Sequence, residues 1–153
     1  MQLTIFTDYG LRSLMFLAAH PDRKCSVREI SDLYGISRNH LVKVVHRLAQ
    51  LGYITSTKGK GGGIMLAEGM ESLRLGDLVQ KLEPHMNSVE CFDLATNTCK
   101  VVAGCQLKHY LTEANKAFIE ALNCYTLADT VKNRKLFMFD QSARNHQKMG
   151  KKA

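Results

Sequence analysis

Three cysteines lie close together in the segment VECFDLATNTCKVVAGCQLKHYL, residues 89–111. Seven residues separate Cys91 from Cys99, and five separate Cys99 from Cys105. A structural zinc site is generally built from ligand pairs with about two to four residues between them, so these gaps are long for zinc. A flexible loop can wrap around a larger iron–sulfur cluster, whose usual protein ligands are cysteine thiolates. The spacing leaves three alternatives: an iron–sulfur cluster, a zinc site, or a group of thiols that senses peroxide.

The rest of the sequence indicates a reducing compartment. The first residues, MQLTIFTD, contain no basic segment and no long apolar run, so we expect no signal peptide, no membrane span and a cytoplasmic protein. Thiols stay reduced there, and five cysteines are a poor disulfide framework, which favours metal binding or redox sensing by the three clustered ones. We expect the other two, Cys25 and Cys124, to be small buried or half-buried apolar side chains.

The positive charge is concentrated in the first half of the chain. The formal net charge is +7, and residues 1–66 hold nine Lys and Arg against four Asp and Glu. Residues 67–139 are close to neutral, and the last fourteen residues are again basic. A polyanion partner for the first half explains this distribution, and a merely soluble basic surface is the alternative.

The first half also has the pattern of a helix-turn-helix. We predict a first helix over 8–20, capped by Thr7 and stopped by Pro21. Ser26 and Glu29 have capping-box spacing at the start of a second helix that runs to about residue 34. A turn with a glycine follows, and Ser37 is expected to cap a third helix that runs to about residue 51.

The third helix separates into two faces when each residue is rotated by about 100°. One face is apolar, and the other carries Asn39, Lys43, His46, Arg47 and Gln50. Residues 33–57 contain no acidic residue, which is unusual for an ordinary solvated face and favours contact with phosphates and base edges. The predicted DNA-contacting residues of this helix are Ser37, Arg38, Asn39, His40, Lys43 and Arg47.

A β-hairpin is predicted directly after this helix. The runs YITSTK and IMLAE have strand character, and the glycine-rich link GKGGG joins them. Lys58 and Lys60 fall at the hairpin tip, where Gly61 and Gly62 allow the backbone to approach a ligand closely. A hairpin that follows a recognition helix is the wing of a winged helix, so these four residues join the predicted DNA-binding set.

The second half of the chain predicts a dimerisation element. A short helix over about 76–83 ends at Pro84, and a longer one runs from about 105 to 123. Apolar residues repeat along the longer helix with coiled-coil spacing at Leu107, Leu111, Ala114, Phe118, Ala121 and Tyr125. This seam is short enough to pack on its own domain instead. Dimerisation is favoured because helix-turn-helix proteins commonly bind paired half-sites.

These features predict a mainly α fold with a small β-hairpin wing. The expected parts are a winged helix-turn-helix over 1–83, a cysteine-bearing loop over 84–104, a dimerisation helix with a short following helix over 105–131, and a basic disordered tail over 132–153.

Four sequence features together resemble one family of bacterial winged-helix regulators. They are FTDYGLRSLMFLA, SRNHLVKVVHRL, the GGI of the wing, and the C-x7-C-x5-C loop before a long helix. The family includes the iron–sulfur regulator IscR and the nitric-oxide-sensing repressor NsrR, and the likeness spans about residues 1–131. The resemblance implies a homodimeric DNA-binding protein with a cluster held by Cys91, Cys99 and Cys105.

The same resemblance suggests the fourth ligand. IscR-type members place a histidine three residues after the last cysteine, where this chain has Lys108, with His109 one position later. The phrases TDYGLR, SRNHLVK, LEP and YTLAD are most similar to the nitric-oxide-sensing branch, which uses an aspartate near the start of the first helix. Asp8 holds that place, and would reach the cluster of the partner subunit. Arg12, one turn later, could orient its carboxylate.

We therefore interpret the chain as a repressor with an iron–sulfur cluster, [4Fe-4S] in preference to [2Fe-2S], which releases an operator when nitric oxide reacts with the cluster. One alternative is an IscR-type regulator that responds to the state of the cluster. The other is a small zinc- or thiol-dependent enzyme, against which stands the absence of a nucleophile–base motif.

Overall fold

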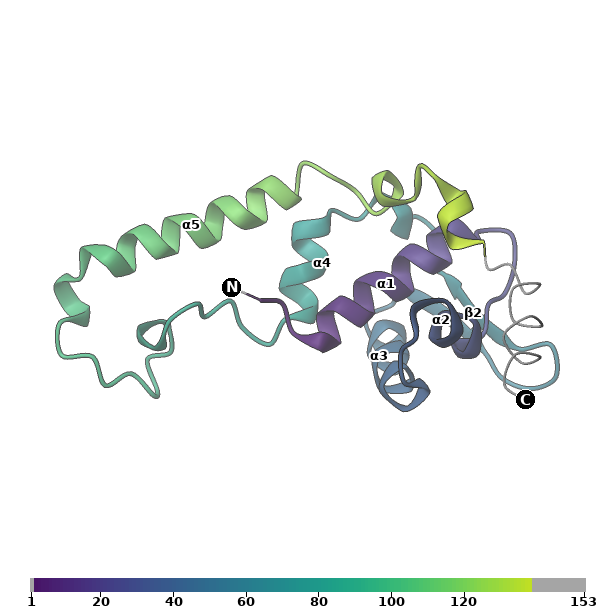
Figure 1. Cartoon of the computed structure of the whole chain (residues 1–153), viewed down its shortest axis with the longest axis horizontal. Coiled ribbons are helices and arrows are strands. Elements are labelled where there is room, and N and C mark those ends of the chain that lie inside the picture. The colour runs from purple at the N-terminus through teal and green to yellow at the C-terminus, as the bar shows by residue number, and fades with distance from the viewer. Residues whose placement is uncertain (1, 139–153) are drawn as a thin grey trace, which may run out of the picture.

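The computed structural model describes residues 2–138 and is mainly α-helical with one β-hairpin, as the sequence predicted. Its main elements are α1 (Ile5–Ala19), α2 (Val27–Tyr34), α3 (Arg38–Gln50), β1 (Ile54–Thr57), β2 (Gly63–Leu66), α4 (Leu75–Leu82) and α5 (Gln106–Leu122). Short 3-10 turns are η1 (Met70–Ser72), η2 (Glu90–Phe92), η3 (Val102–Gly104), η4 (Ala128–Val131) and η5 (Arg134–Phe137). In Figure 1, α1 to α4 and the hairpin form one compact body, from which α5 and the preceding loop extend.

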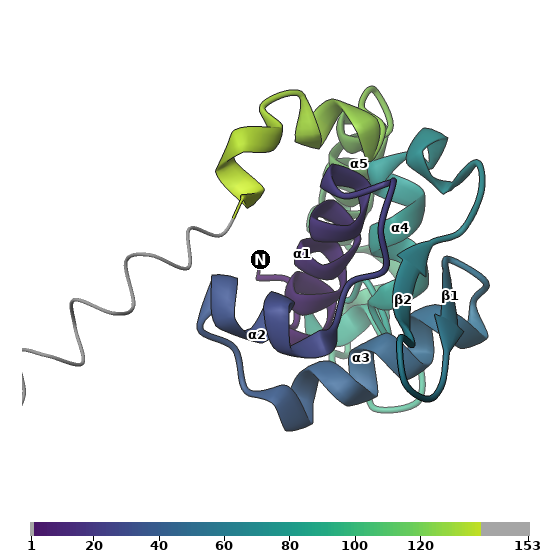
Figure 2. The ribbon, with the colours of Figure 1, turned by 90° about the vertical axis from the view of Figure 1, so that its right-hand side faces the viewer.

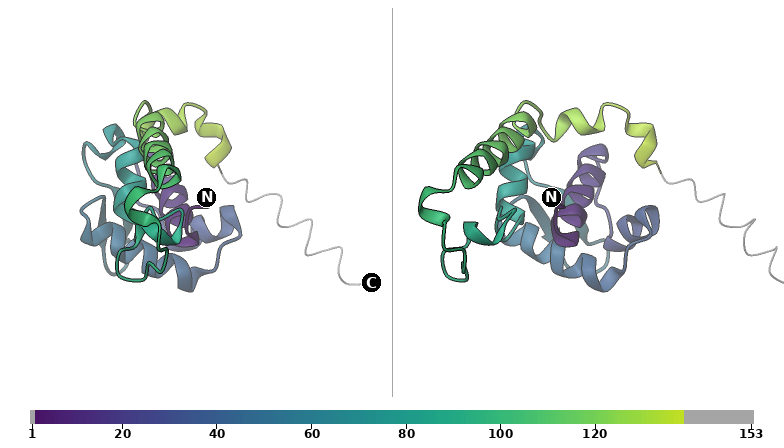
Figure 3. Two further views of the ribbon diagram at one scale, coloured as in Figure 1. Left: turned by 90° about the vertical axis from the view of Figure 1, so that its left-hand side faces the viewer. Right: turned by 60° about the vertical axis from the view of Figure 1, so that its left-hand side comes forward.

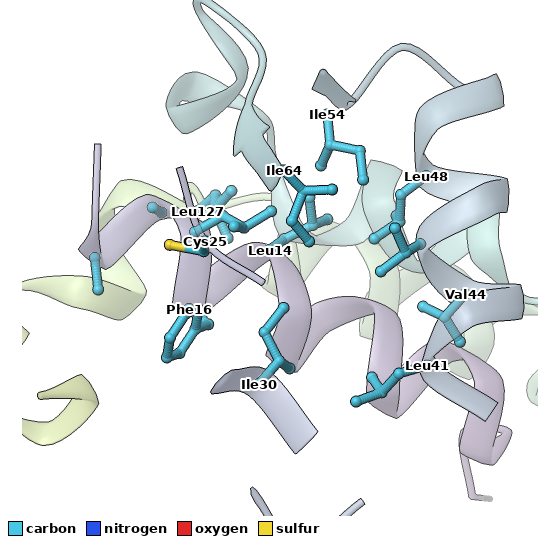
Figure 4. Close-up of a cluster of buried hydrophobic side chains, with 14 of the residues drawn as sticks. Leu14, Phe16, Cys25, Ile30, Leu41, Val44, Leu48, Ile54, Ile64 and Leu127 are labelled. Carbon is cyan, nitrogen blue, oxygen red and sulfur yellow. The ribbon is translucent and has the colours of Figure 1, made fainter. Parts of the chain in front are cut away.

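Helix α1 lies at the centre of the compact body. Its Leu14, Phe16 and Leu17 are at most 1% exposed. The helix packs against α3, α4, β2 and the turns η4 and η5. Figure 4 shows its side chains among buried residues contributed by α2, α3, both strands and the segment after α5. Burial of this helix therefore joins segments that are far apart in the sequence.

The start of α1 differs from the prediction. The helix begins at Ile5, and Thr4 caps it by accepting a hydrogen bond from the Thr7 backbone N–H at 3.2 Å. Thr7, the expected cap, is a completely buried residue inside the first turn. Thr4, three residues earlier, takes the capping position, whereas Thr7 is buried in the core.

The helix-turn-helix forms as predicted, with one change at a cap. Ser26 and Glu29 make both hydrogen bonds of the capping box at the start of α2. Gly35 ends α2 with a φ of +67°, a left-handed conformation that glycine adopts without steric cost. Ser37 occupies the N-cap position of α3, but its side chain makes no capping hydrogen bond. The polar Ser37 side chain thus stays exposed at the start of α3.

Strands β1 and β2 form the predicted antiparallel hairpin, with Ile54 opposite Leu66 and Thr57 opposite Gly63. The backbone of Cys25 also pairs with strand β2, because it exchanges hydrogen bonds of 2.9 and 2.8 Å with Ile64. Cys25 itself is 1% exposed, as expected. Figure 2 shows the hairpin beside α3, so the wing is held to the body from both sides.

A polar junction fixes α5 to α4. Asn123, just after α5, accepts a hydrogen bond from the Asp77 backbone N–H at 3.0 Å and donates one to the Asp77 carboxylate at 3.0 Å. The Arg74 guanidinium donates to the Asn123 carbonyl at 2.6 Å. Gly76 makes room for this contact, since a Cβ there would lie 2.5 Å from both the Asn123 side-chain oxygen and the Ile119 carbonyl. The long helix is thereby anchored at its C-terminal end.

The chain after α5 returns to the compact body (Figure 3). Leu127, Val131 and Phe137 are all buried, and η5 packs against α1. The predicted tail over 132–153 therefore cannot begin at residue 132, because Phe137 inserts into the core. Residues 139–153 lie outside the described part of the chain.

Within residues 2–138, no helix has both the length and the apolar character needed to cross a membrane.

Gly76→Ala should lower the free energy of unfolding by about 1–3 kcal/mol, because its new Cβ would collide with the backbone and side chain of the junction. Gly104→Ala is the matched control, since a Cβ there meets no atom within 4 Å, and its effect should stay within about 0.5 kcal/mol. Urea unfolding of both variants measures the difference. Equal stabilities would show that α5 is not fixed at Gly76.

Candidate functional site

The exposed face of α3 has the composition that the sequence predicted. Leu41, Val44, Val45 and Leu48 are buried, whereas Arg38, Asn39, His40, Lys43, His46, Arg47 and Gln50 are exposed. The exposed set supplies amide, imidazole and cationic groups and no carboxylate. Such a face can donate hydrogen bonds to phosphates and pair with base edges in a major groove.

The wing continues this basic surface. Lys58 and Lys60 are exposed at the hairpin tip. The tip depends on its glycines, because Gly61 has a φ of +78° and a Cβ on Gly62 would collide with the Thr57 carbonyl oxygen. The predicted roles of Gly61 and Gly62 thus have a conformational basis in the turn. From residue 33 to residue 67 the sequence contains no Asp or Glu.

The three clustered cysteines lie on the loop between α4 and α5 as free thiols. Cys91 sits in η2 and is half-buried, Cys99 is exposed, and Cys105 is the half-buried N-cap residue of α5. Among residues 2–138, no three His, Cys, Asp or Glu side chains are close enough together to hold a metal ion. The structure therefore places the cysteines on one loop without assembling them into a site.

One carboxylate ties the two sides of this loop together. Glu90 accepts hydrogen bonds from the backbone N–H of Thr98 at 2.6 Å and from its hydroxyl at 2.7 Å. These bonds, the side-chain one first, lower the pKa of Glu90. Glu90 and Thr98 directly precede Cys91 and Cys99, so the bonds bring together the two chain segments that carry those cysteines.

The loop is otherwise held by few contacts. None of residues 83–105 is buried, and the amide of Asn115 on α5 holds the Met86 carbonyl at 2.8 Å. The donor set nevertheless suits an iron–sulfur cluster, since it consists of three free thiols. A loop without a core of its own can close around a cluster at low cost in packing.

Asp8 lies in the first turn of α1 and forms the predicted pair with Arg12. The Arg12 guanidinium donates to one oxygen of the Asp8 carboxylate at 2.9 Å, and both side chains are 42% exposed. Arg12 also lies over the ring of Tyr34, 5.6 Å from its centroid. An exposed pair of this kind contributes little stability. Its effect is to orient the carboxylate and to link α1 to the last residue of α2.

The residues that follow the third cysteine do not resemble a ligand site. His109 pairs with Glu113 on the polar face of α5, at 3.4 Å, and both side chains are about two-thirds exposed. Lys108, half-buried, holds the position of the IscR-type histidine. The alternative in which a histidine supplies the fourth ligand therefore has no support in this part of the chain.

Two features of the surface were missed or misjudged from the sequence. Cys124 is exposed, so the expectation that it would be a buried or half-buried side chain is wrong. It directly follows Asn123, the C-cap residue of α5. Val42 was not singled out, yet it is 55% exposed on α3 beside the polar face. Rotation about the helix axis from Asn39 would have placed it at the edge of that face.

Comparisons with known proteins agree with this architecture. Residues 3–133 match the model of the Rrf2 family, described as iron-dependent transcriptional regulators. The HTH-type transcriptional regulator NsrR of Bacillus subtilis (strain 168) is 47% identical over 139 residues, which cover 90% of this chain and 95% of that protein.

Two solved structures share the fold. IscR of T. potens superposes with a TM-score of 0.68 at 24% identity, over 95% of this chain and 96% of that one. CymR, the global cysteine regulator of B. subtilis, superposes with a TM-score of 0.66 at 23% identity, over 84% of this chain and 95% of that one. Together with the family match over almost the whole described structure, these similarities establish that the chain belongs to the Rrf2 family of winged-helix transcriptional regulators.

Proposed function

We propose that this transcriptional regulator is a homodimeric repressor whose DNA affinity depends on an iron–sulfur cluster that reacts with nitric oxide. The observation that carries the proposal is the combination of an acid-free DNA-reading face with three free thiols on a loosely packed loop. The 47% identity to NsrR supports it, as does the resemblance of TDYGLR and SRNHLVK to the nitric-oxide-sensing branch.

The DNA interface in this proposal consists of α3 and the wing. Asn39, Lys43 and Arg47 face outward where a recognition helix meets base edges, and Ser37, Arg38 and His40 surround its N-terminal end. Lys58 and Lys60, with Gly61 and Gly62 shaping the turn, contact phosphates beside the groove. A dimer of such units would bind two half-sites about 34 Å apart, one helical turn of DNA.

Cys91, Cys99 and Cys105 would hold the cluster, [4Fe-4S] in preference to [2Fe-2S], with Asp8 of a second subunit as the fourth ligand. The cluster would supply iron that can bind nitric oxide. A carboxylate is a harder ligand than a thiolate, so the iron bound to Asp8 would be the most labile. One oxygen of Asp8 accepts the Arg12 hydrogen bond, and its other oxygen has no hydrogen-bond partner in the described part of the chain.

The contacts of Arg12 explain how a change at Asp8 would affect DNA binding. Arg12 joins Asp8 on α1 to Tyr34, which is directly followed by the Gly35 turn and then by α3. Release of Asp8 would change the position of Arg12 over Tyr34, at the base of the DNA-reading helix. A switch requires an element whose two arrangements the ligand favours differently, and in this proposal the Arg12–Tyr34 contact would be that element.

Dimerisation through α5 is supported by the face that the helix leaves uncovered. Ile119 is its buried residue and faces the rest of the fold. The predicted seam lies on another face, where Leu107, Ala114 and Ala121 are exposed and Leu111 and Phe118 are half-buried. The fold of one protomer therefore does not cover the seam, and α5 of a second copy can pack against it.

An IscR-type regulator that responds to the state of its cluster is the remaining alternative. The T. potens IscR structure supports the shared fold, at 24% identity. The polar-face position of His109 favours the proposal with Asp8. The enzyme alternative is dropped, because both the family and the NsrR relative are transcriptional regulators.

Replacing the basic residues of this interface should weaken DNA binding in two different ways. Lys43→Ala or Arg47→Ala should reduce binding to an operator more than binding to random DNA, at a cost of about 1–3 kcal/mol. Lys58→Ala or Lys60→Ala should lower the slope of log affinity against log salt by about 0.9 for each phosphate that the variant no longer neutralises. Lys116→Ala, on the polar face of α5, is the control and should change neither quantity. Parent-like binding by all four variants across salt concentrations would refute the assignment.

The cluster ligands can be tested with two exposed cysteines. Cys99→Ala, purified without air, should lose its bound iron and its visible absorption, because one of three thiolates is gone. Cys124→Ala removes an equally free thiol outside the loop and should retain both. The iron content and the visible absorption spectrum are measured for the parent protein and for both variants. A parent protein that binds zinc and is colourless would contradict the proposal, as would a Cys99→Ala protein that keeps its iron.

The dimer interface can be tested without disturbing the protomer core. Ala114→Glu adds a charge to the exposed seam and should give monomers, since burying an unpaired carboxylate is costly. Thr112→Glu adds the same charge on the polar face of α5 and should remain dimeric. Sedimentation equilibrium of the two proteins provides the comparison. A dimeric Ala114→Glu protein would place the interface elsewhere.

A further inference from the structure

Val42 is the one apolar side chain on the exposed surface of α3. Eight residues of this helix are exposed, and the other seven are polar or cationic. Val42 is 55% exposed and does not belong to the buried core. Helix propensity does not explain a valine at this position, because valine is a poorer helix former than the straight-chain residues that usually occupy exposed helix surfaces.

The surroundings of Val42 belong to the proposed DNA-reading face. Residues three and four apart are neighbours on a helix surface, so Val42 lies beside Arg38, Asn39 and His46, all of which are exposed. Its other neighbour at this spacing, Val45, is 8% exposed and points into the core. Val42 thus stands at the boundary between the buried face and the polar face, with its methyl groups available to a molecule that covers α3.

Double-stranded DNA offers one apolar group in the major groove. The C5 methyl of thymine projects from the base edge, and apolar side chains recognise it by contact. The polar neighbours of Val42 suit the remaining base-edge groups, since asparagine pairs with adenine and the cations pair with guanine or phosphate. A valine among these polar side chains can make an apolar contact with the methyl group of thymine, which no other base of DNA carries.

We propose that Val42 is a specificity-determining residue that packs against a thymine methyl in each half-site. The proposal rests on the assignment of α3 as the DNA-reading helix. Side chains three residues apart on a helix lie about 5–6 Å from each other, and successive bases are about 3.4 Å apart along the duplex. The thymine therefore falls within two base pairs of the base that Asn39 contacts.

The test replaces thymines of an operator with uracil, which differs from thymine only by lacking the methyl group. An operator is first selected from random DNA with protein purified without air, and each thymine is then replaced in both half-sites at once. For the parent, one such double replacement should lower affinity about ten- to twentyfold, since each of the two half-sites then buries about one methyl group less. Val42→Ala should lower affinity for the thymine operator by a similar factor and bind the thymine and uracil operators equally.

The controls separate this inference from the proposed function. Val42→Ala changes no charge, so the salt dependence of its binding should match the parent. Leu136→Ala removes an exposed apolar side chain outside α3 and should keep the full thymine preference. If the parent binds its operator tightly but no thymine-to-uracil replacement matters, or if Val42→Ala keeps the same preference, the inference is wrong while DNA binding by α3 stands. Failure to select any operator would overturn both.

Discussion

Burial of α1 is the constraint on which the rest of the structure depends. The helix carries Leu14, Phe16 and Leu17 at its centre, and α3, α4, the hairpin and the segment after α5 all pack around it. The fold can complete its core only by bringing these segments to α1. As a result, Asp8 at the exposed start of α1 has a defined position relative to the DNA-reading helix. Arg12 contacts both Asp8 and Tyr34, the last residue of α2.

The cysteine-bearing loop, in contrast to α1, is not held in place by a buried core. It has no buried residue between 83 and 105, and its internal order comes from a few hydrogen bonds such as those between Glu90 and Thr98. Segments with few buried contacts open and rearrange at low free-energy cost. The molecule thus combines a DNA-binding body whose geometry is fixed by its core with a loop whose geometry can follow a bound group. Its anchors are α4 on one side and the helix α5 on the other.

Local signals predicted the fold well where packing and capping act over a few residues. The capping box at Ser26, the glycine turn at Gly35 and the hairpin all form in their predicted places. The start of α1 was misplaced because the burial of Thr7, which leaves Thr4 as the cap, depends on tertiary packing. The return of the chain at Phe137 and the exposure of Cys124 were missed for the same reason. The sequence indicated the three cysteines of one loop by residue type, but the described part of the chain does not bring their thiols together into a metal site.

The proposed control of DNA binding by the cluster is tested most directly by measuring operator affinity during stepwise addition of nitric oxide to air-free protein. The visible absorption of the same sample is recorded at each step. We expect tight binding at the start and a loss of affinity in proportion to the loss of cluster absorption. With Asp8→Ala, affinity should be weak from the beginning and should not respond. Affinity that stays constant while the absorption disappears, or an Asp8→Ala protein that switches like the parent, would show that the cluster does not control DNA binding through Asp8.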